Sequence, residues 1–275
     1  MLDESRLGKP EDVLRKLPIK LWGHSIEVFD LSHPFSEKTP TWPFVAENAQ
    51  IIRIRSHAKD RVLAHKLCHT MHMSTHTDAP LHVEDGYPSI DEVPIDRYIG
   101  EGVVVSIPKK KWEIITPDDL ENVDPPIERG DIVIINTGWH HHYGDNITYF
   151  CYAPGLYKEA GEWFVKKGVK AVGVDLPAMD HPLGTRLAQG AGHPPLMPWL
   201  LEEYKKETGR DVYEDFPYWE PCHRILYTHG IVGFENIGGD VDKVTGKRCL
   251  IIGMPLKWVG GDGSMVRPIA IVGKQ

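Results

Sequence analysis

Residues 72–82 of the chain read His72-Met73-Ser74-Thr75-His76-Thr77-Asp78-Ala79-Pro80-Leu81-His82. This segment places three imidazoles and a carboxylate within eleven residues, and two further histidines, His65 and His69, precede it. Imidazole and carboxylate are the side chains that bind Zn²⁺ or Mn²⁺ at neutral pH. A His-x-x-x-His pair alone is a weak signal, but the added aspartate and third histidine make the set far more specific. The segment therefore predicts a metal site.

The local structure of this segment can be predicted from its alternation. Residues 67–74 alternate in the manner of a strand whose two faces are both partly buried, so His72 is expected near the end of a strand. Pro80 has no N–H for a strand ladder, and His76 and Asp78 are therefore expected on the loop that follows. Because they are two residues apart, they project together if that loop is extended.

The same residues resemble a known family. The pattern H-x-G-T-H-x-D-x-P-x-H marks the metal-dependent cyclase family, which includes bacterial kynurenine formamidase and isatin hydrolase. The chain matches it at six positions: His72, Thr75, His76, Asp78, Pro80 and His82. It departs from the family at Ser74, where glycine is usual. Further similarity covers most of the chain, including 30–34, 42–43, 130–139, 154–155 and 172–175.

Two residues near the other end of the chain extend the resemblance. His223 and Glu235 stand twelve apart and are similar to the second histidine and the glutamate of the formamidases. Isatin hydrolases tend to carry glutamine where this chain has Glu235. A carboxylate at that position favours a formamidase-like site that holds two metal ions.

The resemblance implies a fold and a set of roles. The fold is α/β, a swivelling β/β/α domain with a barrel-like mixed sheet flanked by helices, in a homodimer or higher homo-oligomer. The implied cofactor is a divalent metal ion, Zn²⁺ or Mn²⁺, one or two per subunit. The implied metal ligands are His72, His76 and Asp78. His223 and Glu235 are implied as ligands of a second metal site or as groups on the substrate side. His82 is the implied catalytic acid and base, since an imidazole with a pKa near 6.5 suits proton transfer at neutral pH.

The remaining chain reads as a mixed α/β protein. Short apolar runs bounded by Gly, Pro and Asp predict strands at 26–31, 51–54, 102–107, 131–137, 170–175, 225–234, 249–252 and 265–272. The apolar stripe of 157–167, followed by Gly168, predicts a helix, and 198–206 predicts a second one. No repeat or linker divides residues 1–275, so one domain is expected. The Pro- and aromatic-rich segment 192–221 suggests an insertion or lid, or a crossing to a partner subunit.

Bulk properties exclude several classes of protein. The net charge of −8 argues against a nucleic-acid partner, because phosphate binding needs a basic surface. No apolar run approaches the ~20 residues of a membrane helix, and no signal peptide is recognised, so a cytoplasmic protein is expected. The four cysteines form no C-x-x-C pair and are expected to be reduced and buried.

Other motifs leave alternatives open. Phe216 and Trp219 precede His223, and they either anchor the core or form an aromatic wall for a ring-shaped substrate; Trp42 is similar. The run His140-His141-His142 is expected at the surface or at a pocket rim, since consecutive side chains diverge. The segment 260–263 reads as a turn. No G-x-S-x-G occurs, so a serine nucleophile is unsupported.

These observations favour a divalent-metal-dependent hydrolase that opens a C–N bond of a small amide, formamide or cyclic amide by metal-activated water. A lactone hydrolase of the trans-dienelactone type would use the same chemistry, and the motif does not separate the two. The alternative from another class is a non-catalytic protein that binds a metal or ligand on the same scaffold.

Overall fold

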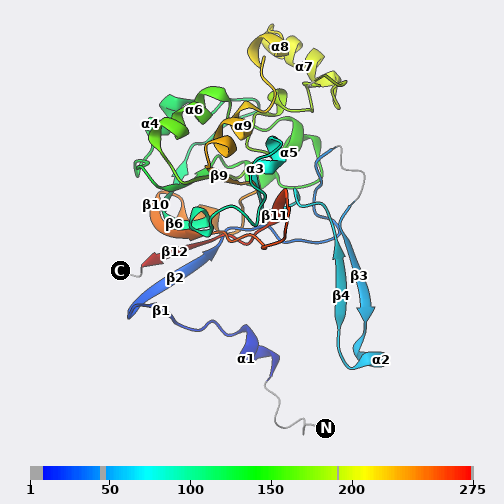
Figure 1. Ribbon diagram of the computed structural model, residues 1–275, viewed down its shortest axis with the longest axis vertical. Coiled ribbons are helices and arrows are strands. Elements are labelled where there is room, and N and C mark those ends of the chain that lie inside the picture. Colours follow the sequence, from blue (N-terminus) through cyan, green and yellow to red (C-terminus); the bar gives the residue numbers. More distant parts are fainter. Residues whose placement is uncertain (1–8, 44–47, 191, 274–275) are drawn as a thin grey trace.

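The computed structural model describes residues 9–43, 48–190 and 192–273, and its centre is an eight-stranded mixed sheet (Figure 1). The spatial order is β1 (Ile19–Leu21), β2 (His24–Asp30), β12 (Ile269–Gly273), β10 (Lys247–Ile252), β6 (Ile99–Ser106), β7 (Ile132–Asn136), β8 (Ala171–Val174) and β9 (Val232–Phe234). The four strands β6 to β9 are parallel, and the other neighbours pair antiparallel. The α/β class and the mixed sheet flanked by helices are thus confirmed.

The central strands are buried on both faces. Along β6, Val103 and Val105 pack into one hydrophobic cluster, while Val104 between them packs into a second cluster on the opposite face. The neighbouring β7 repeats this alternation, with Val133 on one face and Ile134 on the other. Strands buried on both sides need a continuous apolar run, which is what made them recognisable in the sequence.

Helices cover the sheet and occupy the connections. They are α1 (Pro10–Leu14), α2 (His57–Asp60), α3 (Pro80–Val83), α4 (Pro117–Glu121), α5 (Ile147–Cys151), α6 (Lys158–Lys167), α7 (Trp199–Thr208), α8 (Val212–Asp215), α9 (Pro221–Thr228) and α10 (Val241–Val244). Two longer helices, α6 and α9, pack against each other on one side of the sheet, with α4 beside them (Figure 1). The helices α7 and α8 lie at the far end of that layer (Figure 1).

Two small sheets complete the fold. A hairpin of β3 (Gln50–Arg55) and β4 (Ala64–Cys68) extends away from the main sheet, with α2 at its tip (Figure 1). The strands β5 (His76–Asp78) and β11 (Gly263–Met265) pair antiparallel. This second pair carries His76 and Asp78 of the predicted metal motif.

Most of the predicted elements are confirmed. Six predicted strands correspond to β2, β3, β6, β7, β8 and β10. The two predicted helices correspond to α6, which ends at Gly168 in a left-handed conformation (φ 74°), and to α7, which ends at Gly209 (φ 73°). Glycine adopts this conformation without a steric penalty. The first helix therefore ends where the sequence indicated, while α7 continues two residues beyond the predicted 198–206.

Three of the predicted strands were wrong. The predicted strand at 225–234 is the helix α9 followed by the short strand β9, because Pro221 begins a helix whose buried face includes Cys222 and Leu226. The predicted strand at 265–272 is divided between β11 and β12, with Pro268 between them, and proline cannot donate to a ladder. The predicted strand at 67–74 ends at Cys68, and its residues from 65 to 68 are exposed rather than partly buried.

The cysteines are reduced, and three of them are buried; the exposed one is Cys68. Among the described residues, no helix has both the length and the apolar character that crossing a bilayer requires.

Candidate metal centre

The strand β5 brings two predicted ligands into the protein interior. His76 and Asp78 are buried on this strand rather than on a loop, because β5 pairs with β11 on one side and forms a bridge to Glu235 on the other. The bridge consists of two backbone hydrogen bonds, of 3.3 Å from the His76 N–H and of 3.0 Å from the Glu235 N–H. An extended backbone points alternate residues the same way, so His76 and Asp78 face one space.

The side chains of His76, Asp78 and Glu235 are spaced like ligands around one ion. His76 Nε2 lies 3.4 Å from Asp78 Oδ1 and 3.3 Å from Glu235 Oε2. Ligands bound at about 2.0–2.1 Å in a tetrahedron are separated by about 3.3 Å. The other ring nitrogen, Nδ1, lies 2.8 Å from the Ser74 carbonyl oxygen, to which it donates. His76 Nε2 itself is buried and has no hydrogen-bond partner among the described residues.

The backbone at Ser74 explains the glycine that is usual in the family. Ser74 has φ 56°, in the left-handed region that favours glycine. This turn places the Ser74 carbonyl beside His76. The chain therefore retains the turn with a serine, at some cost in backbone strain.

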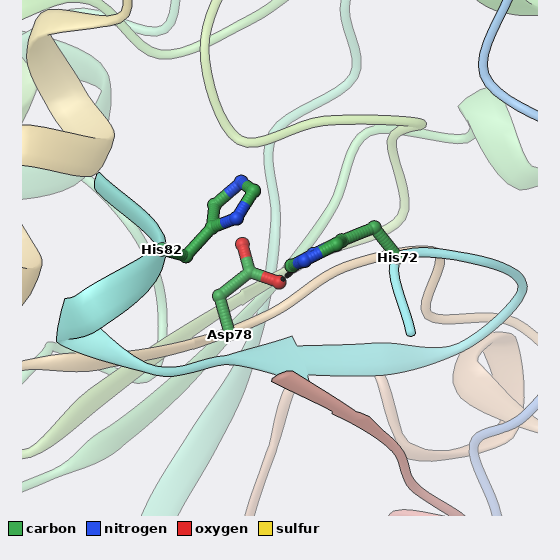
Figure 2. Close-up of side chains that lie close together, drawn as sticks. All are labelled: His72, Asp78 and His82. Carbon is green, nitrogen blue, oxygen red and sulfur yellow. Dashed lines mark hydrogen bonds and ion pairs between the residues drawn. The ribbon is translucent and has the colours of Figure 1, made fainter. Parts of the chain in front are cut away.

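His72 and His82 form a second group around Asp78. His72 Nδ1 lies 2.6 Å from Asp78 Oδ1, and its Nε2 lies 2.9 Å from Asp262 Oδ2. The His82 ring, carried by α3, lies with its centroid 3.8 Å from that of His72. Figure 2 shows the Asp78 carboxylate directed toward the His72 ring, while His82 projects from the neighbouring helix. One ligand atom from each of the three lies within 4.8 Å of the others, so they too can share an ion.

The first turn of α9 supplies His223. Its Nε2 lies 2.8 Å from Glu235 Oε1 and 3.7 Å from Asp78 Oδ2. Its Nδ1 lies 2.6 Å from the buried Asp180, which also accepts the His223 backbone N–H at 2.9 Å. A carboxylate that fixes one nitrogen of an imidazole and leaves the other toward a metal is the usual outer partner of a ligating histidine.

The electrostatics of this cluster favour a cation. Asp78, Asp180 and Glu235 are all buried, and in the described part of the chain no lysine or arginine forms an ion pair with them. Burial alone would lower the pKa of His72, but the charge of Asp78 and a hydrogen bond to Asp262 raise it to about 10. Against the effect of burial, the same carboxylates also raise the pKa values of His76 and His223, so protonated imidazoles supply the positive charge that buried carboxylates need. A divalent cation with N and O ligands would take over that charge and bind His76 Nε2.

A cavity of about 440 Å³ opens beside these groups. Its wall includes all six predicted ligand and acid–base residues, together with apolar surface from Trp42, Met71, Pro177 and Ala178. Trp42 thus lies where a substrate would contact it. Such a mainly apolar wall with a few convergent polar groups is typical of small-molecule sites.

The other two aromatic candidates lie elsewhere. Phe216 is 1% exposed and packs in the core, stacked on His181 with ring centroids 4.3 Å apart. It therefore anchors the core and does not form a wall for a substrate. Trp219 does not line the cavity; its ring lies under the Arg224 guanidinium at 5.0 Å. The residue next to it, Glu220, does line the cavity.

The sequence analysis missed three residues of the wall and its support. Asp180 belongs to no predicted motif, Asp262 was expected only in a turn, and Glu220 directly follows the aromatic run that ends at Trp219. Glu220 is a non-glycine residue with φ 42°, and burial raises the pKa of its carboxyl to about 7. No local spacing pattern links these residues to the histidines, so the sequence carried no signal for them.

The fold is that of an α/β protein, and its cavity is lined by side chains that could hold a metal ion. Comparison with known proteins identifies the family. A profile of the putative cyclase family matches residues 29–181, more than half of the chain. The chain belongs to this family. It is 24% identical over 246 residues to a kynurenine formamidase of Bacillus cereus (strain ATCC 10987 / NRS 248). The aligned region covers 88% of this chain and 96% of the relative.

Solved structures show the same fold. Isatin hydrolase A from Ralstonia solanacearum superposes with a TM-score of 0.72 at 23% identity, covering 90% of this chain and 92% of that one. A potential metal-dependent hydrolase with cyclase activity superposes with a TM-score of 0.65 at 19% identity, covering 91% of this chain and 100% of the other.

Proposed function

We propose that this protein is a divalent-metal-dependent hydrolase that opens a C–N bond of a small amide, formamide or cyclic amide. One observation carries the proposal: His76 Nε2 is buried without a hydrogen-bond partner among the described residues, between the carboxylates of Asp78 and Glu235, in the wall of a mainly apolar cavity. The kynurenine formamidase and isatin hydrolase relatives support amide chemistry.

The proposed ligands are His72, His76 and Asp78, with His223 and Glu235 completing the set. Two overlapping groups of ligand atoms that share Asp78 support one or two ions per chain, Zn²⁺ or Mn²⁺. A bound divalent cation supplies Lewis acidity and lowers the pKa of water. Asp180 holds the Nδ1 proton of His223, and Ser74 holds that of His76, so each ring keeps its Nε2 toward the cavity.

His82 is the proposed acid and base. Its ring stands exposed toward the cavity and forms no hydrogen bond with any described residue. Desolvation by the surrounding protein lowers the pKa of its imidazole below the usual 6.5. The ring is therefore neutral at pH 7 and able to accept a proton. It can then return that proton to the leaving nitrogen.

The test is a substrate panel with metal-loaded and metal-free protein. N-formylkynurenine, isatin and a dienelactone distinguish formamide, cyclic amide and lactone chemistry, and elemental analysis of protein purified without added metal identifies the ion. We expect His82→Ala to retain the metal and lose turnover, while His65→Ala on the exposed face of β4 retains both. If none of the three substrates is hydrolysed in a metal-dependent way, the proposal is wrong. If His82→Ala loses an ion, His82 is a ligand.

We also propose that the protein works as a homodimer or higher homo-oligomer. The projecting hairpin exposes apolar side chains that a second copy would cover, including Ile54 (60% exposed) and Leu67 (46% exposed). Exposed apolar surface of this kind is typical of protein contacts. Light scattering should give a multiple of the 31.1 kDa chain mass; a monomer would contradict this.

A further inference from the structure

A second group of metal-ligand side chains lies outside the cavity. It consists of His140 and His141, on the 3₁₀ turn η3 (Trp139–His142), and of Asp242 on α10. The sequence analysis expected this histidine run at the surface or a pocket rim with diverging side chains. His141 and His142 are exposed as expected, but His140 is buried, and its ring centroid lies 4.0 Å from that of His141. None of the three lines the cavity described above.

We propose that His140, His141 and Asp242 form a second divalent-cation site. Asp242 Oδ2 lies 3.3 Å from His140 Nε2 and 3.4 Å from His141 Nε2. These are the separations expected for nitrogen and oxygen ligands at about 2.0–2.1 Å from one tetrahedral ion. Two imidazoles and one carboxylate suit Zn²⁺ and leave a fourth position for water.

The inner histidine is held in the orientation that such a site needs. His140 Nδ1 lies 2.9 Å from Asp175 Oδ2, and Asp175 is fully buried. An ionised carboxylate only accepts hydrogen bonds, so His140 Nδ1 carries a proton. His140 Nε2 faces Asp242 at hydrogen-bond distance, and a metal there would replace a proton between these two atoms. Asp175 is itself fixed, since its Oδ1 accepts hydrogen bonds from the Thr137 N–H at 3.0 Å and hydroxyl at 2.7 Å.

The carboxylate on the other side is oriented as well. The Asn136 amide donates to Asp242 Oδ1 at 2.9 Å, which directs Oδ2 toward the two imidazoles. Asn136 ends β7, so the outer partners on both sides come from the ends of neighbouring parallel strands. A cation here would link α10 to η3 through its ligands. None of its ligands lines the cavity of the candidate catalytic centre, so an ion here would be separate from that centre.

Zinc titration of metal-free protein tests the site. We expect His141→Ala and Asp242→Asn each to bind one Zn²⁺ per chain fewer than the unmodified protein. Both side chains are more than half exposed, at 64% and 53%, so their replacement leaves the fold intact. His142→Ala is the matched control, because His142 is on the same turn but packs against Trp139, with ring centroids 4.7 Å apart.

The result separates this site from the catalytic one. Zinc-loaded His141→Ala is expected to keep the hydrolytic rate of the unmodified protein while lacking one ion. Equal zinc content in His141→Ala and the unmodified protein would overturn the proposal. So would an equal loss from His142→Ala, since any surface histidine would then count as a ligand.

Discussion

At the scale of single residues, Asp180 affects the candidate centre without lining its cavity. It accepts two hydrogen bonds from His223 and one, of 2.8 Å, from the Cys222 N–H. In Asp180→Asn, one acceptor oxygen becomes an NH₂ group that meets these donors, so the His223 ring loses its fixed orientation. We expect metal affinity to fall about 10- to 100-fold, measured by competition with a chelator.

The control for this change is Asp211→Asn. Asp211 also accepts a backbone N–H at the start of a helix, that of Tyr213 on α8, but it is not part of the cavity wall. Asparagine is an equally good helix cap, so both stability and metal affinity should be preserved. Unchanged affinity in Asp180→Asn would contradict the positioning role of this carboxylate.

Some of the site residues could be predicted from sequence, and others could not. Four of them fall within residues 72–82, where local spacing alone identifies a ligand pattern. His223 and Glu235 became visible through resemblance to a family. Asp180 and Asp262 join the site only through the folded chain, and an isolated aspartate in a loop is typical of many turns.

At the scale of elements, close backbone contact fixes the loop that carries Asp180. Gly155 lies against this loop, and a Cβ atom at Gly155 would stand 2.3 Å from His181 Cα. A backbone atom cannot move aside as a side-chain tip can. We therefore expect Gly155→Ala to destabilise the protein by about 1–3 kcal/mol, measured by urea unfolding.

Gly273→Ala is the matched control, because a Cβ atom at Gly273 in β12 would meet nothing within 4 Å. Its unfolding midpoint should equal that of the unmodified protein. If both variants unfold at the same urea concentration, the contact between Gly155 and the His181 backbone is not a constraint.

Elements were predictable where periodicity and end signals agreed. The helix α6 has an apolar stripe and a terminal glycine, and β7 is a buried apolar run between polar ends. The helix α9 lacked this agreement. Its sequence PCHRILYT is short and joins the β-branched Ile231 and Val232 after one turn, so the apolar content resembled one long strand.

At the scale of the whole molecule, His181 links stability to pH. It is fully buried; its Nε2–H donates to the Trp112 carbonyl oxygen at 3.0 Å, and its Nδ1 accepts the Leu183 N–H at 3.2 Å. Burial lowers the pKa of this imidazole from 6.5 to about 4. Between these values the unfolded chain binds a proton that the folded protein does not, so stability falls as the pH falls from 6.5 toward 4.

The expected loss from this residue is about 2–3 kcal/mol between pH 7 and pH 4.5. Urea unfolding of metal-free protein at both pH values measures it. His181→Gln should lose less stability on acidification by about that amount, whereas His65→Gln, at an exposed position, should match the unmodified protein. Equal pH dependence in all three proteins would show that His181 does not stay neutral in the folded state.

The strand order of the candidate centre has a consequence for biosynthesis. The strand β5 leaves the ribosome early, but Glu235 and β11, which flank it in the fold, are synthesised much later. At the usual 5–20 residues per second, the growing chain carries His72, His76 and Asp78 without their partners for on the order of ten seconds. The nascent chain thus exposes half of a chelating site, and a complete centre forms only after translation has passed Met265.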